Sequence, residues 1–255
     1  MFNSIFITEN FKNKRLDRIL VETDHVKSRQ RAFSLIINGN VYIGEEKLNK
    51  PGKIIKKNQI IRIRGNENPW VSRGGLKLAK AINYFKVSVK DKTCLDIGCS
   101  TGGFTDVLVK NEAKKIFAVD VGYGQFDWRL RNLEKVELLE KTNAKFLSSK
   151  IVSEPIDLIV CDVSFISLKK VIMPCKKLLK KKFEIIALIK PQFEANKKLV
   201  GRGGVIRDSS VHKYICDDIS NWFSELFNPS FVKIIESPIM GQKGNKEFLI
   251  YIKVF

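Results

Sequence analysis

The sequence is poor in histidine, and its five cysteines form no Cys-x-x-Cys pair. Two histidines and cysteines without that spacing offer no ligand set for a structural metal ion, so we predict no metal site. An odd number of cysteines argues against a disulfide framework. We therefore expect a protein of the reducing cytoplasm.

Long hydrophobic runs are also missing. The longest, Ile185–Ile189, has five residues, whereas a helix that crosses a bilayer needs about 20. The N-terminal stretch Met1–Glu9 has no basic leader and no sustained apolar core, so it does not resemble a secretory signal. The sequence predicts no stable membrane insertion.

Positive charge is what the chain has in excess. It carries 46 Lys and Arg against 27 Asp and Glu over 255 residues, a net charge of +19. Such a chain attracts polyanions, with nucleic acid as the first candidate partner and an anionic membrane surface as the second. The hydrophobic fraction of 44% is enough for an ordinary core, which argues against wholesale disorder.

Residues 1–65 have the pattern of a small α+β domain. Apolar residues at helical spacing predict two short helices, of which the second is capped by Ser28 and stopped by Asn38-Gly39. Their expected buried residues are Leu16, Ile19 and Leu20 in the first helix, and Ala32, Phe33, Ile36 and Ile37 in the second. Alternating apolar residues at 41 and 43, and at 61 and 63, predict strands.

This first domain is also the more densely basic part, with 14 Lys and Arg against 6 Asp and Glu. A solvated basic face is the simpler explanation, but a compact unit with this density of arginine also makes a good phosphate-binding surface. The candidate RNA-binding residues are Arg15, Arg18, Ser28, Arg29, Arg31, Lys47 and Lys50.

Residues 66–76 are expected to form a linker, and residues 77–255 alternate strands with helices. Strand-like runs cover 93–97, 115–119, 156–161, 184–189, 231–235 and 248–252, and a helical pattern covers 211–222. This order predicts an α/β fold, a Rossmann-like, doubly wound, mostly parallel sheet that ends in a strand pair. Ligands bind such sheets at the carboxyl ends of the strands, where Gly98, Asp120, Asp162 and Lys190 fall.

The stretch from Asp96 to Phe104 places a glycine-rich loop between a strand and a helix. A dinucleotide-binding loop would carry glycine at position 100, where this chain has Ser100, and the preceding Asp96 would repel a pyrophosphate. A carboxylate there suits a cationic ligand without phosphate, such as S-adenosylmethionine, and Asp120 stands where ribose hydroxyls are bound. A tight turn with two core-facing acids is the alternative. The candidate cofactor contacts are Asp96, Gly98, Ser100, Thr101, Gly102, Gly103, Phe104 and Asp120.

Two lysines and two acids, Lys77, Asp162, Lys190 and Glu247, form the candidate catalytic set. Burial beside a second lysine disfavours the ammonium form, which can turn a lysine into a general base. Solvated lysines are common in this chain, however. Lys190 could also stay cationic and only position a hydroxyl group.

Several motifs in combination resemble a known family. They are Lys14-Arg-Leu-Asp17, Ser28-Arg-Gln-Arg31, Trp70-Val-Ser-Arg-Gly-Gly-Leu-Lys77, Asp96-Ile-Gly-Cys-Ser-Thr-Gly-Gly-Phe104, Lys190-Pro-Gln-Phe-Glu194 and Gly244-Asn-Lys-Glu-Phe248. The first 65 residues resemble the RNA-binding αL-motif domain of a small-subunit ribosomal protein, and the rest resembles an FtsJ-type methyltransferase. In this order the two are similar to the TlyA family, over nearly the whole chain.

The resemblance implies an S-adenosylmethionine-dependent enzyme that methylates ribose 2′-hydroxyls, those of cytidine, in ribosomal RNA or in ribosomal subunits. It also implies that Lys77, Asp162, Lys190 and Glu247 form a catalytic tetrad. Because family members are often labelled hemolysins, a membrane-active hemolysin is one alternative function, although no amphipathic or spanning segment supports it. An RNA-binding protein with an inactive transferase domain is the other, and a methyl-transfer assay would distinguish it.

Overall fold

The computed structural model describes residues 2–26, 28–64 and 68–255, in two compact units, 1–69 and 70–255. The first unit is a four-stranded antiparallel sheet in the order β1-β4-β2-β3 with two helices. Its elements are β1 (Phe2–Phe6), a 3-10 turn (Glu9–Phe11), α1 (Leu16–Glu22), α2 (Arg29–Ile37), β2 (Val41–Ile43), β3 (Glu46–Leu48) and β4 (Ile60–Arg64).

Helix α2 confirms part of what its sequence predicts. Ser28 caps it by accepting a hydrogen bond from the backbone N–H of Arg31, and Ala32 and Ile36 are fully buried. The prediction that Phe33 and Ile37 are buried is wrong, since they are 55% and 52% exposed. Each lies one residue, about 100° of helical rotation, beyond a buried neighbour, and so faces away from the core.

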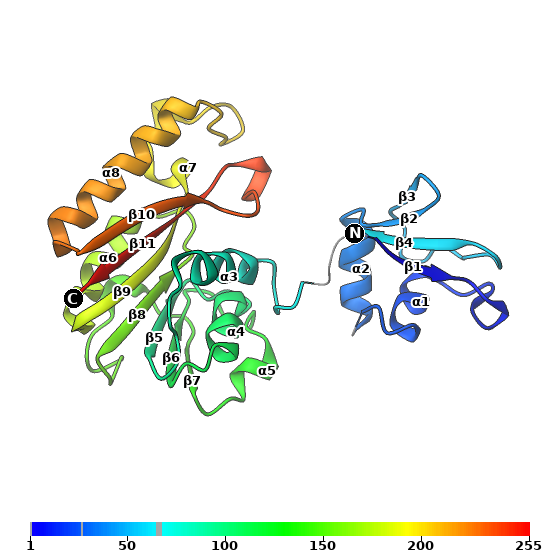
Figure 1. Cartoon of the computed structure of the whole chain (residues 1–255), viewed down its shortest axis with the longest axis horizontal. Coiled ribbons are helices and arrows are strands. Elements are labelled where there is room, and N and C mark those ends of the chain that lie inside the picture. Colours follow the sequence, from blue (N-terminus) through cyan, green and yellow to red (C-terminus); the bar gives the residue numbers. More distant parts are fainter. Residues whose placement is uncertain (1, 27, 65–67) are drawn as a thin grey trace. The chain divides into compact units, whose positions relative to one another are not determined.

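The second unit has a seven-stranded sheet in the order β10-β11-β9-β8-β5-β6-β7 (Figure 1). Strands β9, β8, β5, β6 and β7 run parallel, and β11 pairs antiparallel with both β9 and β10. Its strands are β5 (Thr93–Ile97), β6 (Lys115–Val119), β7 (Val136–Leu139), β8 (Ile156–Cys161), β9 (Leu179–Ile189), β10 (Phe231–Glu236) and β11 (Phe248–Val254). The predicted doubly wound, mostly parallel sheet with a terminal strand pair is therefore confirmed.

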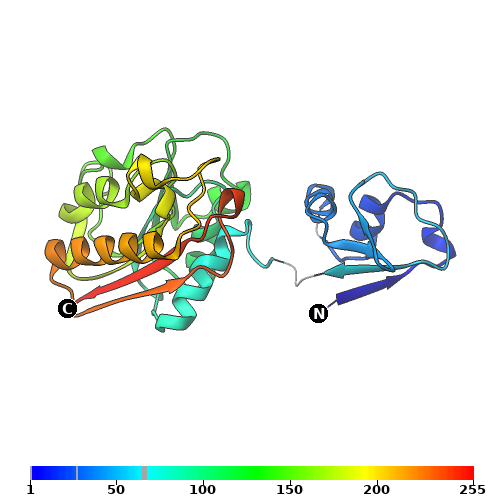
Figure 2. The same ribbon diagram turned by 90° about the horizontal axis from the view of Figure 1, so that it is seen from above.

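Helices cover both faces of this sheet (Figures 1 and 2). The α-helices are α3 (Gly74–Phe85), α4 (Gly103–Lys110), α5 (Trp128–Arg131), α6 (Leu168–Ile172), α7 (Pro191–Glu194) and α8 (Ser209–Phe227), and short 3-10 turns cover 144–146, 173–178, 197–199 and 242–244. Apolar residues of α3, α4 and α5 form the core on one face, and those of α6 and α8 form the core on the other. Strand residues alternate between these two cores, as their twofold repeat requires.

The segment before α3 differs from the expected linker. Residues 66 and 67 lie outside the described residues, but Gly74–Leu76 form the first turn of α3. Trp70 packs so closely on this turn that a side chain at Gly75 would meet it at 2.4 Å. The backbone N–H of Val71 also donates to Asp106 of α4 at 2.9 Å. These contacts attach residues 70–76 to the second unit.

Strand order locates the ligand-binding end of the sheet. The chain leaves β5 toward β6 and β7 on one side, and returns to β8 and β9 on the other. A crevice opens at such a reversal because the two neighbouring connections diverge from the carboxyl ends of their strands. Here it lies between Gly98, after β5, and Asp162, after β8.

Candidate active site

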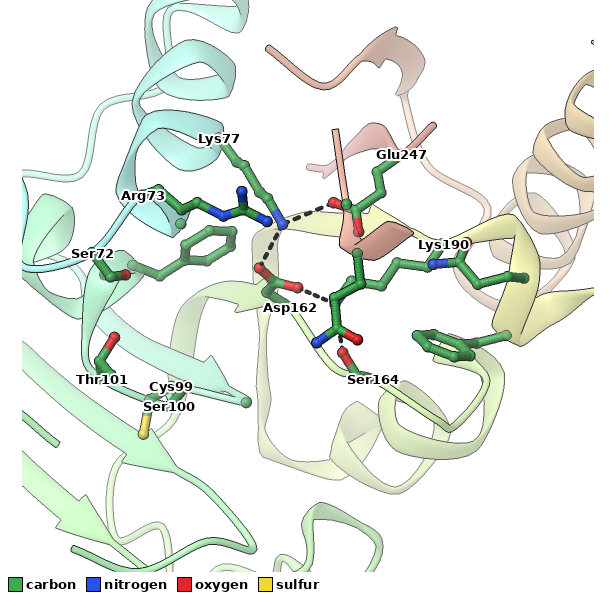
Figure 3. A pocket seen from close by; sticks show the side chains of 18 residues that line it. Ser72, Arg73, Lys77, Cys99, Ser100, Thr101, Asp162, Ser164, Lys190 and Glu247 are labelled. Atoms are coloured by element: carbon green, nitrogen blue, oxygen red, sulfur yellow. Dashed lines mark hydrogen bonds and ion pairs between the residues drawn. The ribbon is translucent and has the colours of Figure 1, made fainter. Parts of the chain in front are cut away.

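Two adjoining cavities lie at the carboxyl edge of the parallel strands. The lysine cavity contains Lys77, Asp162, Lys190 and Glu247 (Figure 3), and the loop cavity contains Asp120 and the loop after β7. The residues that line both are Gly98, Ser100, Asp162, Ser164 and Gln242. The two cavities therefore adjoin around the end of β8.

The four predicted catalytic side chains meet in the lysine cavity (Figure 3). Lys77 Nζ, from α3, lies 3.2 Å from Asp162 Oδ2 and 2.8 Å from Glu247 Oε2. Lys190 Nζ lies 2.6 Å from Asp162 Oδ1 and donates a hydrogen bond to Ser164 Oγ at 2.9 Å. Asp162 thus bridges the two lysines.

Burial makes these contacts strong. Lys77 and Lys190 are each 7% exposed and Glu247 is 3% exposed, so neither sign of charge could remain there without a partner. Burial is the largest influence on Asp162 and raises the pKa of its carboxyl, but the charges of Lys77 and Lys190 outweigh it and hold this pKa below its usual value. In this cluster the charges of the two acids balance those of the two lysines.

The glycine loop after β5 follows the shape of the site. Gly98 has φ +82°, and a Cβ there would lie 2.7 Å from the backbone oxygen of Asp162. Glycine is therefore required for the backbone after β5 to pass this close to the backbone after β8. Ser100, Thr101, Gly103 and Phe104 line the lysine cavity. Gly102 lines neither cavity; a Cβ there would meet Leu130 at 2.6 Å.

Asp120, at the end of β6, lines the loop cavity. Its Oδ2 accepts the backbone N–H of Ser100 at 2.8 Å, and its Oδ1 accepts that of Gly122 at 2.7 Å. The carboxylate therefore holds the glycine loop in place. Each oxygen keeps a further lone pair with which to accept a ligand hydroxyl.

Asp96, in β5, lies in the core between this strand and α4. It is fully buried, lines neither cavity, and accepts a hydrogen bond from Thr105 of α4 at 2.6 Å. Burial raises the pKa of Asp96 to about 7, although the Thr105 hydrogen bond opposes this. Position 96 faces the α4 side of β5, and its carboxyl joins this strand to α4 through Thr105.

Sequence reasoning missed several residues of the lysine cavity. They are Ser72, Arg73, Ser164, Gln192, Phe193 and Gln242. Four of them lie inside the motifs Trp70–Lys77 and Lys190–Glu194. Their closeness in sequence to Lys77 and Lys190 was the signal that could have identified them. Ser164 and Gln242 lie in loops whose positions only the fold determines.

The first unit brings part of the predicted RNA-binding set together. Asp17 is 5% exposed; it binds Arg15 through two 3.0 Å hydrogen bonds and Arg29 through a third of 3.0 Å. Hydrogen bonding to Arg15 is the largest of the effects that lower the pKa of Asp17 to about 2. Lys47 and Lys50 line a shallow hollow around Gly52, and Gly52 lies against the Arg15 guanidinium. Arg18 instead approaches Glu22 at 3.9 Å, and Arg31 donates to the backbone oxygen of Asn68.

Within residues 2–26, 28–64 and 68–255 there is no group of three or more His, Cys, Asp or Glu placed to hold a metal ion. No helix in that part of the chain is both long and apolar enough to cross a membrane.

The second unit is a mixed seven-stranded sheet with a glycine loop after β5 and an acid after β6. A lysine–carboxylate cluster lies where the strand order reverses. These features define a Rossmann-like transferase, and the same chain also contains a small basic unit. The FtsJ-like methyltransferase family model matches residues 70–254, and the S4 domain model matches residues 14–61. The chain belongs to the FtsJ-like methyltransferase family and, within it, to the TlyA family.

Relatives match both units together. The chain is 37% identical to the 16S/23S rRNA (cytidine-2'-O)-methyltransferase TlyA of Mycobacterium tuberculosis, over 95% of this chain and 90% of that protein. It is 40% identical to Hemolysin A of Brachyspira hyodysenteriae, over 93% of this chain and 98% of the other. A solved structure from Streptococcus thermophilus, whose name also contains the word hemolysin, superposes with a TM-score of 0.74 at 34% identity, covering 96% of this chain and 89% of that one.

Proposed function

We propose that this methyltransferase uses S-adenosylmethionine to methylate the 2′-hydroxyl of a ribose, that of a cytidine, in ribosomal RNA. The observation that carries the proposal is the buried network of Lys77, Asp162, Lys190 and Glu247 beside a glycine loop. Its support comes from the M. tuberculosis relative, whose name specifies this reaction and which matches nearly the full length of the chain.

The residues of the loop cavity fit S-adenosylmethionine. Asp120 has oxygens free to accept ribose hydroxyls, and Ser100 and Gly98 border both cavities. Carboxylates at 120 and 162 favour a cationic ligand over a pyrophosphate. Bound there, S-adenosylmethionine supplies an electrophilic methyl group.

The catalytic residues then have to orient a ribose hydroxyl and remove its proton. We assign Lys190 as the base that takes the proton at Nζ. Asp162 orients Lys190 through its 2.6 Å contact, and Lys77 and Glu247 position the ribose. Under the rival assignment Lys190 stays cationic, and the rate comes from alignment alone.

The first unit is proposed to anchor the RNA. Arg15 and Arg29, which share Asp17, present exposed guanidinium groups suited to phosphates. The proposed partner is ribosomal RNA or a ribosomal subunit. The protein is therefore proposed to act in the cytoplasm, where this substrate lies.

Substitution of Lys190 tests the proposal. Lys190→Ala should lower the rate of methyl transfer to ribosomal RNA at least about 10²-fold while S-adenosylmethionine still binds, as expected for loss of a general base. Lys190→Arg decides between the two roles because arginine keeps the charge but does not deprotonate. Near-normal turnover by Lys190→Arg with an unchanged rate–pH profile would rule out a lysine base. Absence of 2′-O-methyl product from the wild-type chain, with both whole subunits and free RNA, would overturn the proposed function.

A further inference from the structure

Lys190 has two partners of different kinds. One is the Asp162 carboxylate at 2.6 Å, and the other is the Ser164 hydroxyl at 2.9 Å. Lys77, by contrast, lies between two carboxylates, Asp162 and Glu247. The partner sets therefore differ: Lys190 has one carboxylate and one neutral hydroxyl, whereas Lys77 has two carboxylates.

Of the two partners, Ser164 is the one that constrains the direction of the amine. Ser164 Oγ accepts a hydrogen bond from Lys190 Nζ, which constrains the direction of an N–H bond, whereas Asp162 Oδ1 lies at ion-pair distance, 2.6 Å, without hydrogen-bond geometry. All three residues line the lysine cavity. With Asp162 alone the amine would rotate about the Cε–Nζ bond.

The loop that carries Ser164 is fastened to the helix that follows Lys190. The ring of Phe165 contacts that of Phe193 of α7 in a tilted arrangement, with ring centroids 4.9 Å apart. Glu194, at the end of α7, accepts the backbone N–H of Leu168 at 2.8 Å. Burial raises the pKa of Glu194, as expected for an enclosed carboxyl. Loop 163–168 and residues 190–194 are therefore joined at four points, which include the hydrogen bonds between Ser167 and Glu194 and between Lys190 and Ser164.

We propose that Ser164 is a positioning residue, whose hydroxyl aims the Lys190 amine at the ribose hydroxyl in the lysine cavity. This inference rests on the proposed function. The Ser164 hydroxyl acts through Lys190, so its removal should reduce turnover without weakening the binding of either substrate. A hydroxyl accepts hydrogen bonds from both the ammonium and the neutral amine, so it keeps the amine oriented when the proton arrives and when it leaves.

Three variants test the proposal. Ser164→Ala should lower kcat about 3- to 10-fold, the effect of one lost hydrogen bond, with the KM values for RNA and S-adenosylmethionine unchanged. Ser164→Thr keeps the hydroxyl at an exposed position and should stay within about 2-fold of wild type. Ser167→Ala is the matched control: it removes a hydroxyl from the same loop that accepts the backbone N–H of Lys169 and caps α6.

The dependence of kcat on pH distinguishes a positioning role from a merely looser loop, because a looser loop would not shift the acidic limb of the profile. The Ser164 hydroxyl stabilises the ammonium form of Lys190 as an acceptor, so Ser164→Ala should shift the acidic limb of the kcat profile toward lower pH. Ser167→Ala should leave the limb in place. Equal kcat and equal limbs in the two alanine variants would overturn the proposal, as would a loss of S-adenosylmethionine affinity that accounts for the lower rate.

A second measurement does not depend on methyl transfer. Competitive labelling of the wild-type protein with acetic anhydride, read out by mass spectrometry, reports the reactivity of the Lys190 amine relative to other lysines. Ser164→Ala should raise this reactivity several-fold, and Ser164→Thr should not. Unchanged labelling in Ser164→Ala refutes the positioning role even if the chain proves inactive on ribosomal RNA, a result that would refute the proposed function instead.

Discussion

Gly241 is the position where one added methyl group should disable the tetrad. It lies in the lysine cavity, and a Cβ there would sit 2.1 Å from Glu247 Oε1 and 2.6 Å from its Cδ. The backbone at Gly241 has φ −73° and ψ −169°, an extended conformation that alanine adopts freely. Any effect of Gly241→Ala therefore comes from the methyl group and not from backbone strain.

The surrounding turn leaves Glu247 as the group that moves. Gly241 donates its backbone N–H to the oxygen of Asn245 at 2.9 Å. Asn245 is 3% exposed, and its side-chain amide donates to the oxygens of Gln242 and Gly204 at 3.2 and 3.0 Å. Shifting the turn would break these buried hydrogen bonds, whereas rotating the end of Glu247 breaks one ion pair.

The size of the effect follows from this geometry. Ordinary contact of a Cβ begins near 3.4 Å, so Glu247 Oε1 must retreat by at least about 1.3 Å from its present 2.1 Å. Lys77 Nζ then loses its 2.8 Å contact with Glu247. A misplacement of about 1 Å in a catalytic arrangement costs on the order of 10²-fold in rate, and we expect that loss in kcat for Gly241→Ala.

Single-turnover methyl transfer, with RNA and S-adenosylmethionine saturating, measures this loss, and a thermal melt checks that the variant is folded. Glu247→Ala provides the reference, because Gly241→Ala in that background should add nothing. If Gly241→Ala turns over within about 2-fold of wild type, the turn yields instead of Glu247 and the reasoning is wrong. A slow Gly241→Ala beside a normal Glu247→Ala would equally exclude Glu247 as the cause.

Three further outcomes are expected. Asp120→Ala removes charge-assisted hydrogen bonds and should weaken S-adenosylmethionine binding by about 1.5–3 kcal/mol, roughly 10- to 150-fold by calorimetry; tight NAD binding with none of S-adenosylmethionine would contradict this assignment. Asp96 has a folded-state pKa raised to about 7 from 3.8, so the folded state loses stability as pH rises from 4 to 7. Asp96→Asn, which can still accept from Thr105, should gain on the order of 3 kcal/mol relative to wild type between pH 4 and pH 8 in urea unfolding, and parallel curves would refute it. The double variant Arg29→Ala, Arg31→Ala should reduce the slope of log affinity for RNA against log salt by roughly 0.7 to 0.9 per lost phosphate contact, with cofactor affinity unchanged; an unaltered slope with full activity would exclude these contacts.

Local sequence determined the class of fold. The central strands of the parallel sheet are short apolar runs buried on both faces, and such runs are read from their own residues, whereas the partly exposed edge strand β7 was not predicted. Runs 93–97, 115–119 and 156–161 coincide with β5, β6 and β8. Motif residues at the ends of these strands also indicated where ligands bind, since carboxyl ends of parallel strands meet at one edge.

Where the pattern of apolar residues is weak or ambiguous, only the tertiary structure shows which element forms and which residues are buried. Strand β1 has no apolar alternation and is defined by its pairing with β4, Phe2 opposite Arg64. Phe33 and Ile37 carry an apolar pattern yet face outward, because only the packing of α2 decides which side of a short helix is covered. Asp96 likewise stands in the motif but turns away from both cavities.

Convergence of Asp162, Lys190 and Glu247 was decided by the sheet, and the packing of α3 adds Lys77. Lys190 and Glu247 are 57 positions apart in sequence, and nothing local relates them. Strand β11 runs antiparallel to β9 with Phe248 opposite Ile189, so the residue before β11 and the residue after β9 emerge at the same edge. An antiparallel last strand presents its amino end where the parallel strands present their carboxyl ends, and this reversal brings Glu247 into the cavity with Lys77, Asp162 and Lys190.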